Sequence, residues 1–492
     1  MIIKSLVRLI PARRSFTISP TATATATPAG LKQVADGRQR VVILGSGWAG
    51  YVLSQQLDTS KYSVLVVSPR PYFVFTPLLN DSAVGTLEFR NVLESLRKRD
   101  HRIEYLQGWA DDVNLVDQTI TVEPSVLDEN VGTALLIIAV GCYSQTFNTK
   151  GVKENAMFMK DVNDARRVRR RILDLFELAK MPFISDTTKA YLLHFAIVGG
   201  GPTGVEFAAC LSDLISDDLA KMYPDLIKHV RITLYDVAPK VLPMFDKSLA
   251  DYAVKLYRRK NIEIKTSHRV VELRRGFPND TEAKKNQDDE PKHRVYTIET
   301  KEDGEVGIGM CVWSTGNMAN PFVAKALNHV RRYPVDTAEL VEGEVVGDAN
   351  ERKWIIQRDP RSGLILVDDH FRVANQQALW LASNLNKHFS SPESYSTVPG
   401  FGFKNLGVMT YLGGAKAVLQ APSPSSNGSG GKTGDDKKSK GKNGGNVNVK
   451  GWVAFLIWRG AYLTMTLSWR NKFLIPVHWL AVRIFGRDVS RF

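Results

Sequence analysis

The stretch VVILGSGWAG at residues 41–50 decides the fold. An apolar, β-branched run leads directly into Gly45, Gly47 and Gly50, and the residues that follow, YVLSQQL, indicate a helix. A strand, a glycine-rich turn and a helix in this order open a Rossmann unit, whose turn and helix N-terminus hold a pyrophosphate. The glycine spacing alone is weak evidence. Its strand–turn–helix context predicts a dinucleotide site.

A second stretch, HFAIVGGGPTGVEFAACL at residues 194–211, repeats this pattern. Its glycines again follow an apolar run, at Gly199, Gly201 and Gly204. The two patterns lie too far apart in the chain to share one sheet. Their separation suits one nucleotide domain inserted into another, so the sequence predicts two dinucleotide sites.

The strands that follow the two turns end differently. RITLYDV at 231–237 ends near Asp236, whose carboxylate can accept hydrogen bonds from an adenosine ribose and repels the 2′-phosphate of NADP. The strand YSVLVVS at 62–68 is followed by Pro69 and Arg70 and has no acid there. This asymmetry indicates two different nucleotides.

Two further runs read as strands that return to the first domain. ALLIIAVG at 134–141 is a buried parallel-strand pattern that ends in Gly141, and MCVWSTGN at 310–317 contains Gly316. Each run closes on a small-residue turn at the carboxyl end of a strand, where α/β proteins bind ligands.

Composition narrows the function further. The chain has 492 residues, 43% of them hydrophobic, which is enough to bury a large core. Its three cysteines, Cys142, Cys210 and Cys311, form no CxxC or CxxxxC pair, so a disulfide framework or a dithiol relay is not expected. The histidines and cysteines show no metal-ligand spacing, and no metal is expected. The net charge of +14 suggests an acidic partner.

The N-terminal residues 1–30 resemble a targeting segment. They include Lys4, Arg8, Arg13 and Arg14, carry no acidic residue, and are rich in Ser and Thr. This composition is typical of a mitochondrial transit peptide. The alternative is a disordered tail with no targeting role.

The C-terminal residues 451–492 interleave aromatic and basic side chains, with Pro476 expected to divide them into two helices. The sequence contains no run of 18 uncharged apolar residues, so no membrane-spanning helix is expected. The aromatic rings suit the headgroup layer and the basic groups suit anionic lipids, so the tail is expected to lie on a membrane. A pair of core-docked helices and a dimer interface are the alternatives. The residues expected at the membrane are Trp452, Trp458, Trp469, Arg470, Trp479 and Arg483.

Four blocks together resemble the mitochondrial type II NADH dehydrogenases. They are VVILGSGWAG, VSPRPYFVFTPLL at 67–79, AIVGGGPTGVEFA at 196–208 and WSTGN at 313–317. The tail LSWRNKFLIPVHWLAVRIFGRDVSR resembles the membrane anchor of that family. The SPR-x-YF-x-FTPLL block is the most specific of these signals.

The resemblance implies an α/β flavoprotein reductase fold with two dinucleotide-binding Rossmann-type domains and a C-terminal membrane-anchoring helical region. FAD would lie on Gly45, Ser46, Gly47, Gly50, Ser68, Arg70, Thr76, Pro77 and Gly141. NADH would lie on Gly199, Gly201, Thr203, Gly204, Glu206, Asp236 and Gly316. Glu206 is similar to the acid that the family carries close to the nicotinamide. The alternative is a carboxylate favoured by the helix dipole.

The resulting domain boundaries follow the motifs. They are 1–38 for the leader, 39–190 and 306–390 for the FAD domain, 191–305 for the NADH domain, and 391–420 with 451–492 for the anchor. Residues 421–450 are rich in Gly, Ser and Lys and are expected to be a disordered loop.

The implied activity is hydride transfer from NADH to flavin, followed by transfer of two electrons to ubiquinone without proton pumping. The enzyme would be peripheral on the anionic surface of the mitochondrial inner membrane, with a dimer through the tail as a further expectation. Another quinone-linked flavin reductase is an alternative, although sulfide oxidation would need a cysteine pair. Nucleic acid is not expected as a partner, because the basic residues accompany no binding motif.

One segment departs from the family. A strand ending in Gly-Asp should supply a third FAD contact, but ALWLASNLNKHF at 378–389 places Ala382 and Ser383 at those positions. The following helix, Pro-x-Thr-Ala-Gln-x-Ala, has no counterpart before residue 404. A catalytically impaired NADH-binding relative is therefore the second alternative.

Overall fold

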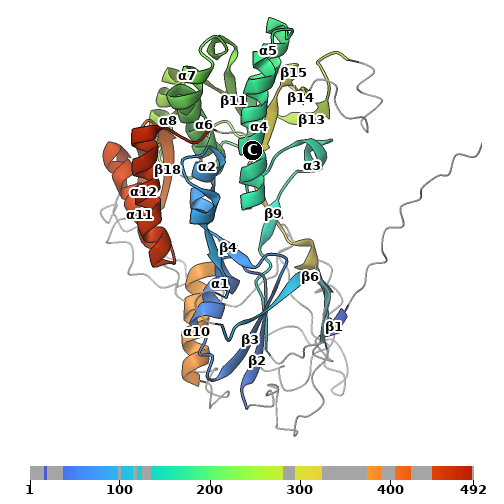
Figure 1. Cartoon of the computed structure of the whole chain (residues 1–492), viewed down its shortest axis with the longest axis vertical. Coiled ribbons are helices and arrows are strands. Elements are labelled where there is room, and N and C mark those ends of the chain that lie inside the picture. Colours follow the sequence, from blue (N-terminus) through green and yellow to red (C-terminus); the bar gives the residue numbers. More distant parts are fainter. Residues whose placement is uncertain are drawn as a thin grey trace, which may run out of the picture. The chain divides into compact units, whose positions relative to one another are not determined.

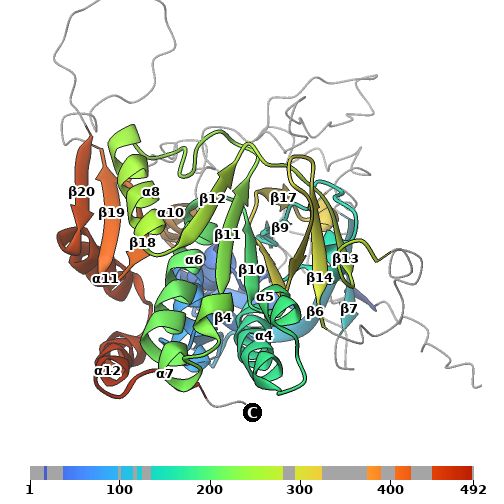
Figure 2. The same cartoon turned by 90° about the horizontal axis from the view of Figure 1, so that it is seen from above.

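The computed structural model of the chain describes residues 16–18, 37–97, 101–114, 119–124, 135–280, 294–323, 374–388, 405–422 and 446–489. The chain divides into two compact units. The first comprises Met1–Phe73, Ser95–Cys142 and Ala319–Phe403, and the second comprises Val74–Glu94, Tyr143–Met318 and Lys404–Phe492. Figures 1 and 2 show the elements of both.

The first unit contains a six-stranded sheet. Its strand order is β1 (Phe16–Ile18), β7 (Thr119–Pro124), β6 (Glu104–Asn114), β3 (Tyr62–Ser68), β2 (Gln39–Leu44) and β8 (Leu135–Ile138). The strands β6, β3, β2 and β8 are parallel neighbours, and α1 (Trp48–Gln56) connects β2 to β3. This is the strand order of a Rossmann half-domain. The prediction from VVILGSGWAG is confirmed.

Within the predicted leader, β1 pairs antiparallel with β7, and the targeting role of that segment stays a prediction. Two expectations for the first unit need correction. The strand β8 forms but is only half-buried, because it lies at the edge of its sheet. The stretch expected to end in a strand and turn is instead α10 (Ala374–His388), with Ala382 and Ser383 inside it.

The helix α10 packs beside α1 in the first unit (Figure 1). The Tyr62 hydroxyl donates to the Leu385 carbonyl at 2.7 Å, and the Asp58 amide donates to Asn386 Oδ1 at 2.9 Å. The sequence of α10, ANQQALWLASNLNKH, contains no Gly, Pro or β-branched residue, which favours a helix over a strand.

The second unit is built on a four-stranded parallel sheet. Its strand order is β12 (Ile262–Thr266), β11 (Arg231–Asp236), β10 (His194–Val198) and β16 (Met310–Trp313). The connecting helices α6 (Pro202–Leu214) and α8 (Lys247–Arg259) follow β10 and β11 (Figure 2). This is again the Rossmann strand order. Because β16 pairs with β10, the prediction that 310–317 returns to the first sheet is wrong.

Smaller elements complete the two Rossmann folds. A three-stranded antiparallel sheet joins β13 (Val270–Arg275), β14 (Tyr296–Thr300) and β15 (Gly304–Ile308). The helix α4 (Val162–Lys180) begins at Asp161 in a capping box with Asp164. The remaining short elements are β4 (Tyr72–Val74), η1 (Thr76–Leu78), α2 (Leu79–Ala83), η2 (Phe89–Val92), β5 (Leu93–Ser95), β9 (Cys142–Ser144), α3 (Val152–Asn155), α5 (Asp186–Leu192), η3 (Ile215–Leu219), α7 (Ala220–Met222), η4 (Ile227–His229) and β17 (Asn317–Ala319).

The C-terminal part of the second unit is a three-stranded sheet followed by two helices. The strands are β18 (Val408–Gly413), β19 (Lys416–Ala421) and β20 (Val447–Gly451), and the helices are α11 (Trp452–Met465) and α12 (Trp469–Phe485). Figure 2 shows α11 against these strands. The strand β20 lies largely within the predicted disordered loop, so that prediction is wrong for residues 447–450.

The break between the two helices also differs from the prediction. The helix α11 ends at Met465, and the Ser468 hydroxyl caps α12 by accepting from the Asn471 amide at 3.3 Å. Pro476 lies inside α12 and does not end it. A good N-cap at Ser468 therefore sets the start of α12. Neither helix, nor any other in the described ranges, is long and apolar enough to cross a bilayer.

Candidate nucleotide sites and C-terminal cleft

The first glycine turn is held in a shape that admits no side chain at two positions. Gly45 has a φ of +106°, and a Cβ there would lie 2.3 Å from the Ala139 carbonyl oxygen. A Cβ on Gly50 would lie 1.9 Å from the Gly45 carbonyl oxygen. Gly47 has no heavy atom within 4 Å of its Cβ position. The turn therefore packs tightly against β8 and α1 but leaves open space beside Gly47, as a bound pyrophosphate requires.

The second glycine turn repeats these constraints in the second unit. Gly199 has a φ of +117°, and its Cβ position lies 2.8 Å from the Ser314 carbonyl oxygen. The Cβ position of Gly204 lies 2.1 Å from the Gly199 carbonyl oxygen, whereas Gly201 faces open space. Thr203, in the first turn of α6, is exposed. Both turns thus have the geometry of a pyrophosphate cradle at a helix N-terminus.

The residues beside the first turn are serines rather than acids. The Ser46 hydroxyl lies 2.9 Å from the Ser68 hydroxyl and donates to the Tyr72 carbonyl at 3.0 Å. Ser68 is the last residue of β3, and its hydroxyl also accepts from the Arg70 amide at 3.3 Å. The first turn therefore contacts the end of β3 through neutral groups.

The equivalent place beside the second turn holds Asp236, the last residue of β11. Its carboxylate accepts a hydrogen bond from the Gly200 amide and a second, at 2.7 Å, from the Ala238 amide. A Cβ on Gly200 would come within 2.8 Å of Asp236 Oδ2. Gly200 is thus a site residue that the sequence reasoning missed, although the run of three glycines was visible. Asp236 shapes the turn and keeps lone pairs for a ribose.

The other expected FAD and NADH residues are placed as follows. Gly141 is exposed with a φ of +71°, just beyond β8 in the first unit. Gly316 is exposed beyond β16, and its carbonyl accepts from the Gln145 amide at 3.2 Å. Thr76 and Pro77 begin η1 and belong to the second unit, whereas Gly45 belongs to the first.

Glu206 is buried in α6, with 6% of its surface exposed. Its carboxyl faces Thr410 and the backbone of Tyr411 in the β18–β19 hairpin. Burial, and then the charge of Asp81, raise the pKa of Glu206 well above its ordinary value. The burial of Glu206 therefore favours its protonated form, and its side chain is not simply a solvated helix-terminal carboxylate.

Asp81 of α2 is a second buried carboxyl, and the sequence reasoning did not single it out. It is 5% exposed, and the Cys210 thiol lies 3.7 Å from its Oδ1. Burial raises the pKa of Asp81, while the charge of Arg459 lowers it. Burial also raises the pKa of Cys210 well above its ordinary value, so this thiol is not activated as a nucleophile.

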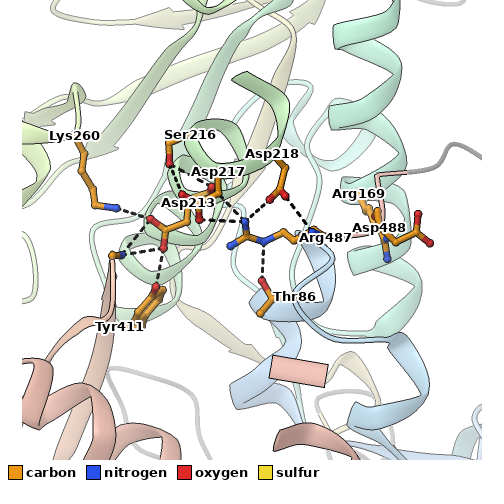
Figure 3. A network of polar contacts seen from close by, with 11 residues as sticks. Thr86, Arg169, Asp213, Ser216, Asp217, Asp218, Lys260, Tyr411, Arg487 and Asp488 are labelled. Atoms are coloured by element: carbon orange, nitrogen blue, oxygen red, sulfur yellow. Dashed lines mark hydrogen bonds and ion pairs between the residues drawn. The ribbon is translucent and has the colours of Figure 1, made fainter. Parts of the chain in front are cut away.

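A polar network ties the end of α12 to α6 and η3 (Figure 3). The Arg487 guanidinium donates to Asp218 Oδ2 at 2.6 Å and to Thr86 Oγ1 at 3.1 Å. Asp213 accepts from the Tyr411 hydroxyl at 2.7 Å and from the Lys260 ammonium. The network therefore links the helix of the second glycine turn to the β18–β19 hairpin and to the C-terminal residues.

A cleft of about 1370 Å³ lies along this network within the second unit. One side is polar and includes Asp213, Asp217 and Asp218. The other side consists of residues of α11 and α12, among them Phe455, Trp458, Arg459, Trp479, Leu480 and Arg483. We call this space the C-terminal cleft.

The four tail tryptophans do not share one surface. Trp452 and Trp469 are 65% and 84% exposed. Trp458 and Trp479 are only 2% and 7% exposed, so the prediction that these two lie at a membrane surface is wrong. Trp458 stacks on Tyr411 at 5.3 Å between ring centroids, which makes it part of the core of the second unit.

The two expected arginines of the tail are both exposed. Arg470 donates to the Arg90 carbonyl at 3.4 Å, near the start of α12. Arg483, near the end of α12, lines the C-terminal cleft. Both residues are therefore exposed, and whether they contact a membrane stays a prediction.

Comparison with known proteins places the chain among the flavin-dependent reductases of pyridine nucleotides. Residues 39–338 match the pyridine nucleotide-disulphide oxidoreductase family, and residues 439–488 match the NDH2 C-terminal domain. The external NADH-ubiquinone oxidoreductase 2, mitochondrial, of Saccharomyces cerevisiae is 32% identical, over 92% of this chain and 82% of that protein.

Two further proteins agree. The internal alternative NAD(P)H-ubiquinone oxidoreductase A1, mitochondrial, of Solanum tuberosum is 33% identical, over 93% of this chain and 88% of that protein. The structure of NDH2 from Plasmodium falciparum in complex with NADH shares the fold, with a TM-score of 0.69 and 23% identity, over 92% of this chain and 99% of that chain. With two glycine turns of matching geometry, the chain belongs to the pyridine nucleotide-disulphide oxidoreductases and, within them, to the type II NADH:ubiquinone oxidoreductases.

Proposed function

We propose that the chain uses FAD to oxidise NADH and to reduce a quinone such as ubiquinone. The two glycine turns carry this proposal, because each combines a positive-φ glycine, a closely packed glycine and an open middle glycine. One named relative is an NADH-ubiquinone oxidoreductase and the other is an NAD(P)H-ubiquinone oxidoreductase. When bound, FAD would supply the hydride acceptor and would pass two electrons to the quinone.

The residues of the first turn fit FAD. The space beside Gly47 leaves room for a pyrophosphate at the N-terminus of α1, where the backbone amides and the helix dipole favour negative charge. The neutral pair Ser46 and Ser68 adds no charge that would repel it.

The residues of the second turn fit NADH. The space beside Gly201 is open at the N-terminus of α6, and Asp236 lies at the end of the neighbouring strand. Its carboxylate would accept from the ribose hydroxyls and would repel the 2′-phosphate of NADPH. Burial raises the pKa of Glu206 and favours its protonated form, so this residue would offer a proton in the same helix.

The proposal is tested by measuring the absorbance and the NADH oxidation activity of the purified protein. We expect the absorbance of bound FAD and oxidation of NADH by a short-chain soluble quinone, with NADPH a poorer donor. Protein that purifies without colour and takes up no FAD would contradict the proposal. Asp236→Ala should bring the rates of NADH and NADPH oxidation closer together. A general loss of activity would lower both rates and leave their ratio unchanged.

A catalytically impaired NADH-binding relative is the second candidate. One observation favours it, namely that α10 occupies the stretch where a strand and turn were expected to contact FAD. This candidate predicts saturable NADH binding with little FAD and no quinone reduction. FAD content per chain therefore decides between the two.

The partner surface that we propose for the tail is the mitochondrial inner membrane. Exposed apolar residues recur at helical spacing along α12, at Trp469, Phe473, Val477, Leu480 and Ile484. Such a row forms one apolar face of a helix. We infer peripheral attachment through this face, with anionic lipids meeting the basic groups. Vesicle co-sedimentation tests it, and concentration-dependent dimerisation without vesicle binding would favour a homodimer instead.

A further inference from the structure

Arg459 of α11 carries a charge that the described part of the chain leaves without an ion pair. Its guanidinium stacks over the rings of Phe455 and Trp479, at 4.5 and 4.3 Å from the ring centroids. Burial lowers the pKa of Arg459, and the charge of Asp81 opposes that shift without forming an ion pair within the described residues. A partly buried cation held by two aromatic rings is suited to an external anion.

Arg483 of α12 adds a second positive charge to the same cleft. It is exposed, lines the C-terminal cleft, and disfavours the charged form of Arg459. Lys260 and Arg487 also line the cleft, but acids match them, since Lys260 pairs with Asp213 and Arg487 pairs with Asp218. Among the described residues, Arg459 and Arg483 form no ion pair, although the charge of Asp81 acts on Arg459, so an external anion would offset their remaining positive charge.

Two buried indole groups add hydrogen-bond donors. Trp458 and Trp479 line the cleft and are 2% and 7% exposed, and within the described residues their Nε1 atoms complete no hydrogen bond, although the Trp458 indole interacts with the nearby Tyr462 hydroxyl. The Trp479 indole interacts with the nearby Asp81 carboxyl but does not complete a hydrogen bond with good geometry. An indole N–H can only donate, and a buried donor without an acceptor is costly. These donors also favour a ligand with acceptor oxygens.

The cleft is apolar on the side of α12. Leu480, Ile484 and Phe485 line it and are also 60%, 62% and 84% exposed. Leu480 and Ile484 belong to the row of apolar residues that we propose to face the membrane. The cleft therefore places the guanidinium groups of Arg459 and Arg483 beside an apolar outer edge, which suits a molecule with an anionic head and aliphatic chains. A neutral quinone head would leave the two guanidinium charges unmatched.

We propose that the C-terminal cleft binds one anionic phospholipid, with its phosphate at Arg459 and Arg483 and its chains along Leu480 and Ile484. The inference rests on the proposed membrane attachment of α12 and adds a specific headgroup site to it. Guanidinium groups bind phosphate through charge-assisted hydrogen bonds, and the buried indoles add donors. The lipid would thus hold the tail at the bilayer through a defined contact.

The experiment uses the full-length, FAD-containing protein and a lipid that stays monomeric. Dihexanoyl phosphatidylglycerol, below its micelle concentration, is titrated by calorimetry against the wild type, Arg459→Gln and Arg483→Gln. Arg470→Gln is the matched control, since it removes the same charge from α12 outside the cleft. We expect saturable binding by the wild type and about tenfold weaker binding by Arg459→Gln, equivalent to about 1.4 kcal/mol. Arg470→Gln should bind as the wild type does.

Several results would overturn the proposal. One is that dihexanoyl phosphatidylcholine binds as tightly as dihexanoyl phosphatidylglycerol. Another is that inorganic phosphate displaces the lipid as effectively as the free lipid does. A third is that Arg459→Gln and Arg470→Gln weaken lipid binding equally. Arg483 is exposed, so Arg483→Gln should fold. If Arg459→Gln does not fold, Arg483→Gln still tests the site. Yellow, active protein without saturable lipid binding would contradict the cleft site alone. Protein that purifies without FAD would contradict the proposed reaction, and the same lipid titration on that protein would still test the cleft site.

Discussion

The Arg487 guanidinium lies 2.6 Å from the Asp218 carboxylate, and both side chains are 9% exposed. This pair joins the residues after α12 to η3, the π-helical turn that continues α6. The helix that starts at the second glycine turn is therefore bound, at its other end, to the C-terminal residues of the chain.

Breaking this pair on one side should destabilise the second unit. Arg487→Met leaves the Asp218 carboxylate buried without its partner, which costs about 3–5 kcal/mol. Thermal unfolding should show a clear drop in Tm. The control is Lys180→Met, because Lys180 and Asp225 form an exposed pair, 49% and 57% exposed, and such pairs contribute little to stability. Equal drops in the two variants would contradict the assignment.

The two kinds of glycine should respond differently to alanine. Gly50→Ala forces a Cβ to 1.9 Å from a backbone oxygen and should disrupt the first turn, with loss of folded protein. Gly47→Ala meets no protein atom within 4 Å, so the chain should fold normally while FAD content falls. Flavin absorbance per folded chain, measured beside circular dichroism, checks both. Full FAD content in Gly47→Ala would show that the pyrophosphate lies elsewhere.

Gly201→Ala provides the same test for the second nucleotide. Its Cβ would also enter open space, so folding and FAD content should be unchanged. The added methyl group occupies the proposed pyrophosphate position, so KM for NADH should rise by about tenfold or more, a loss of at least about 1.4 kcal/mol of binding. Steady-state kinetics with a soluble quinone measures this. An unchanged KM would remove the second turn from the NADH site.

Glu206→Gln should raise stability at neutral pH. Burial raises the pKa of Glu206 in the folded chain, so the unfolded chain loses this proton first as pH rises above about 4.5. The acid therefore lowers stability above that pH, and a neutral amide avoids this cost. The Tm of Glu206→Gln should exceed that of the wild type at pH 8, and the difference should vanish near pH 4. A lower Tm of the variant at pH 8 would argue against a raised pKa of Glu206.

His194 should make the second unit sensitive to mild acid. It is buried in β10, where its ring contacts the Gly307 carbonyl at 3.0 Å and the Thr233 hydroxyl at 2.9 Å. Burial lowers the pKa of His194 to about 4. Because the unfolded chain takes up this proton near pH 6.5, stability is full above that pH and falls towards pH 4. His194→Gln should flatten this part of the Tm–pH curve.

The two Rossmann sheets could be predicted because their signals are local. An apolar run before Gly45 or Gly199 sets the strand, and steric contacts that only glycine permits set the turn. The assignment of β16 could not be made this way, because MCVW reads as a buried strand in either sheet. The strand that β16 joins depends on the path of the chain between the two units. The observed parallel pairing with β10 assigns β16 to the second sheet.

The tail was harder to predict for a different reason. The helix α11 is apolar on most sides, so its sequence does not show that Trp458 faces Tyr411 while Trp452 faces outward. Burial is set by the β18–β20 sheet, a partner that the sequence reasoning placed partly in a disordered loop. Asp81 escaped notice because a single carboxyl has no motif, and its burial depends on α6 and the tail.

The pairing of β19 with β20 has a practical consequence for engineering. Ala421 and Val447 are opposite each other in the register of this antiparallel pair, so the chain leaves and re-enters the sheet at neighbouring points. The cost of closing such a connection grows only slowly with its length, by about 0.6 kcal/mol per doubling. A fluorescent reporter or an affinity tag inserted between these two residues should therefore leave the β18–β19–β20 sheet assembled.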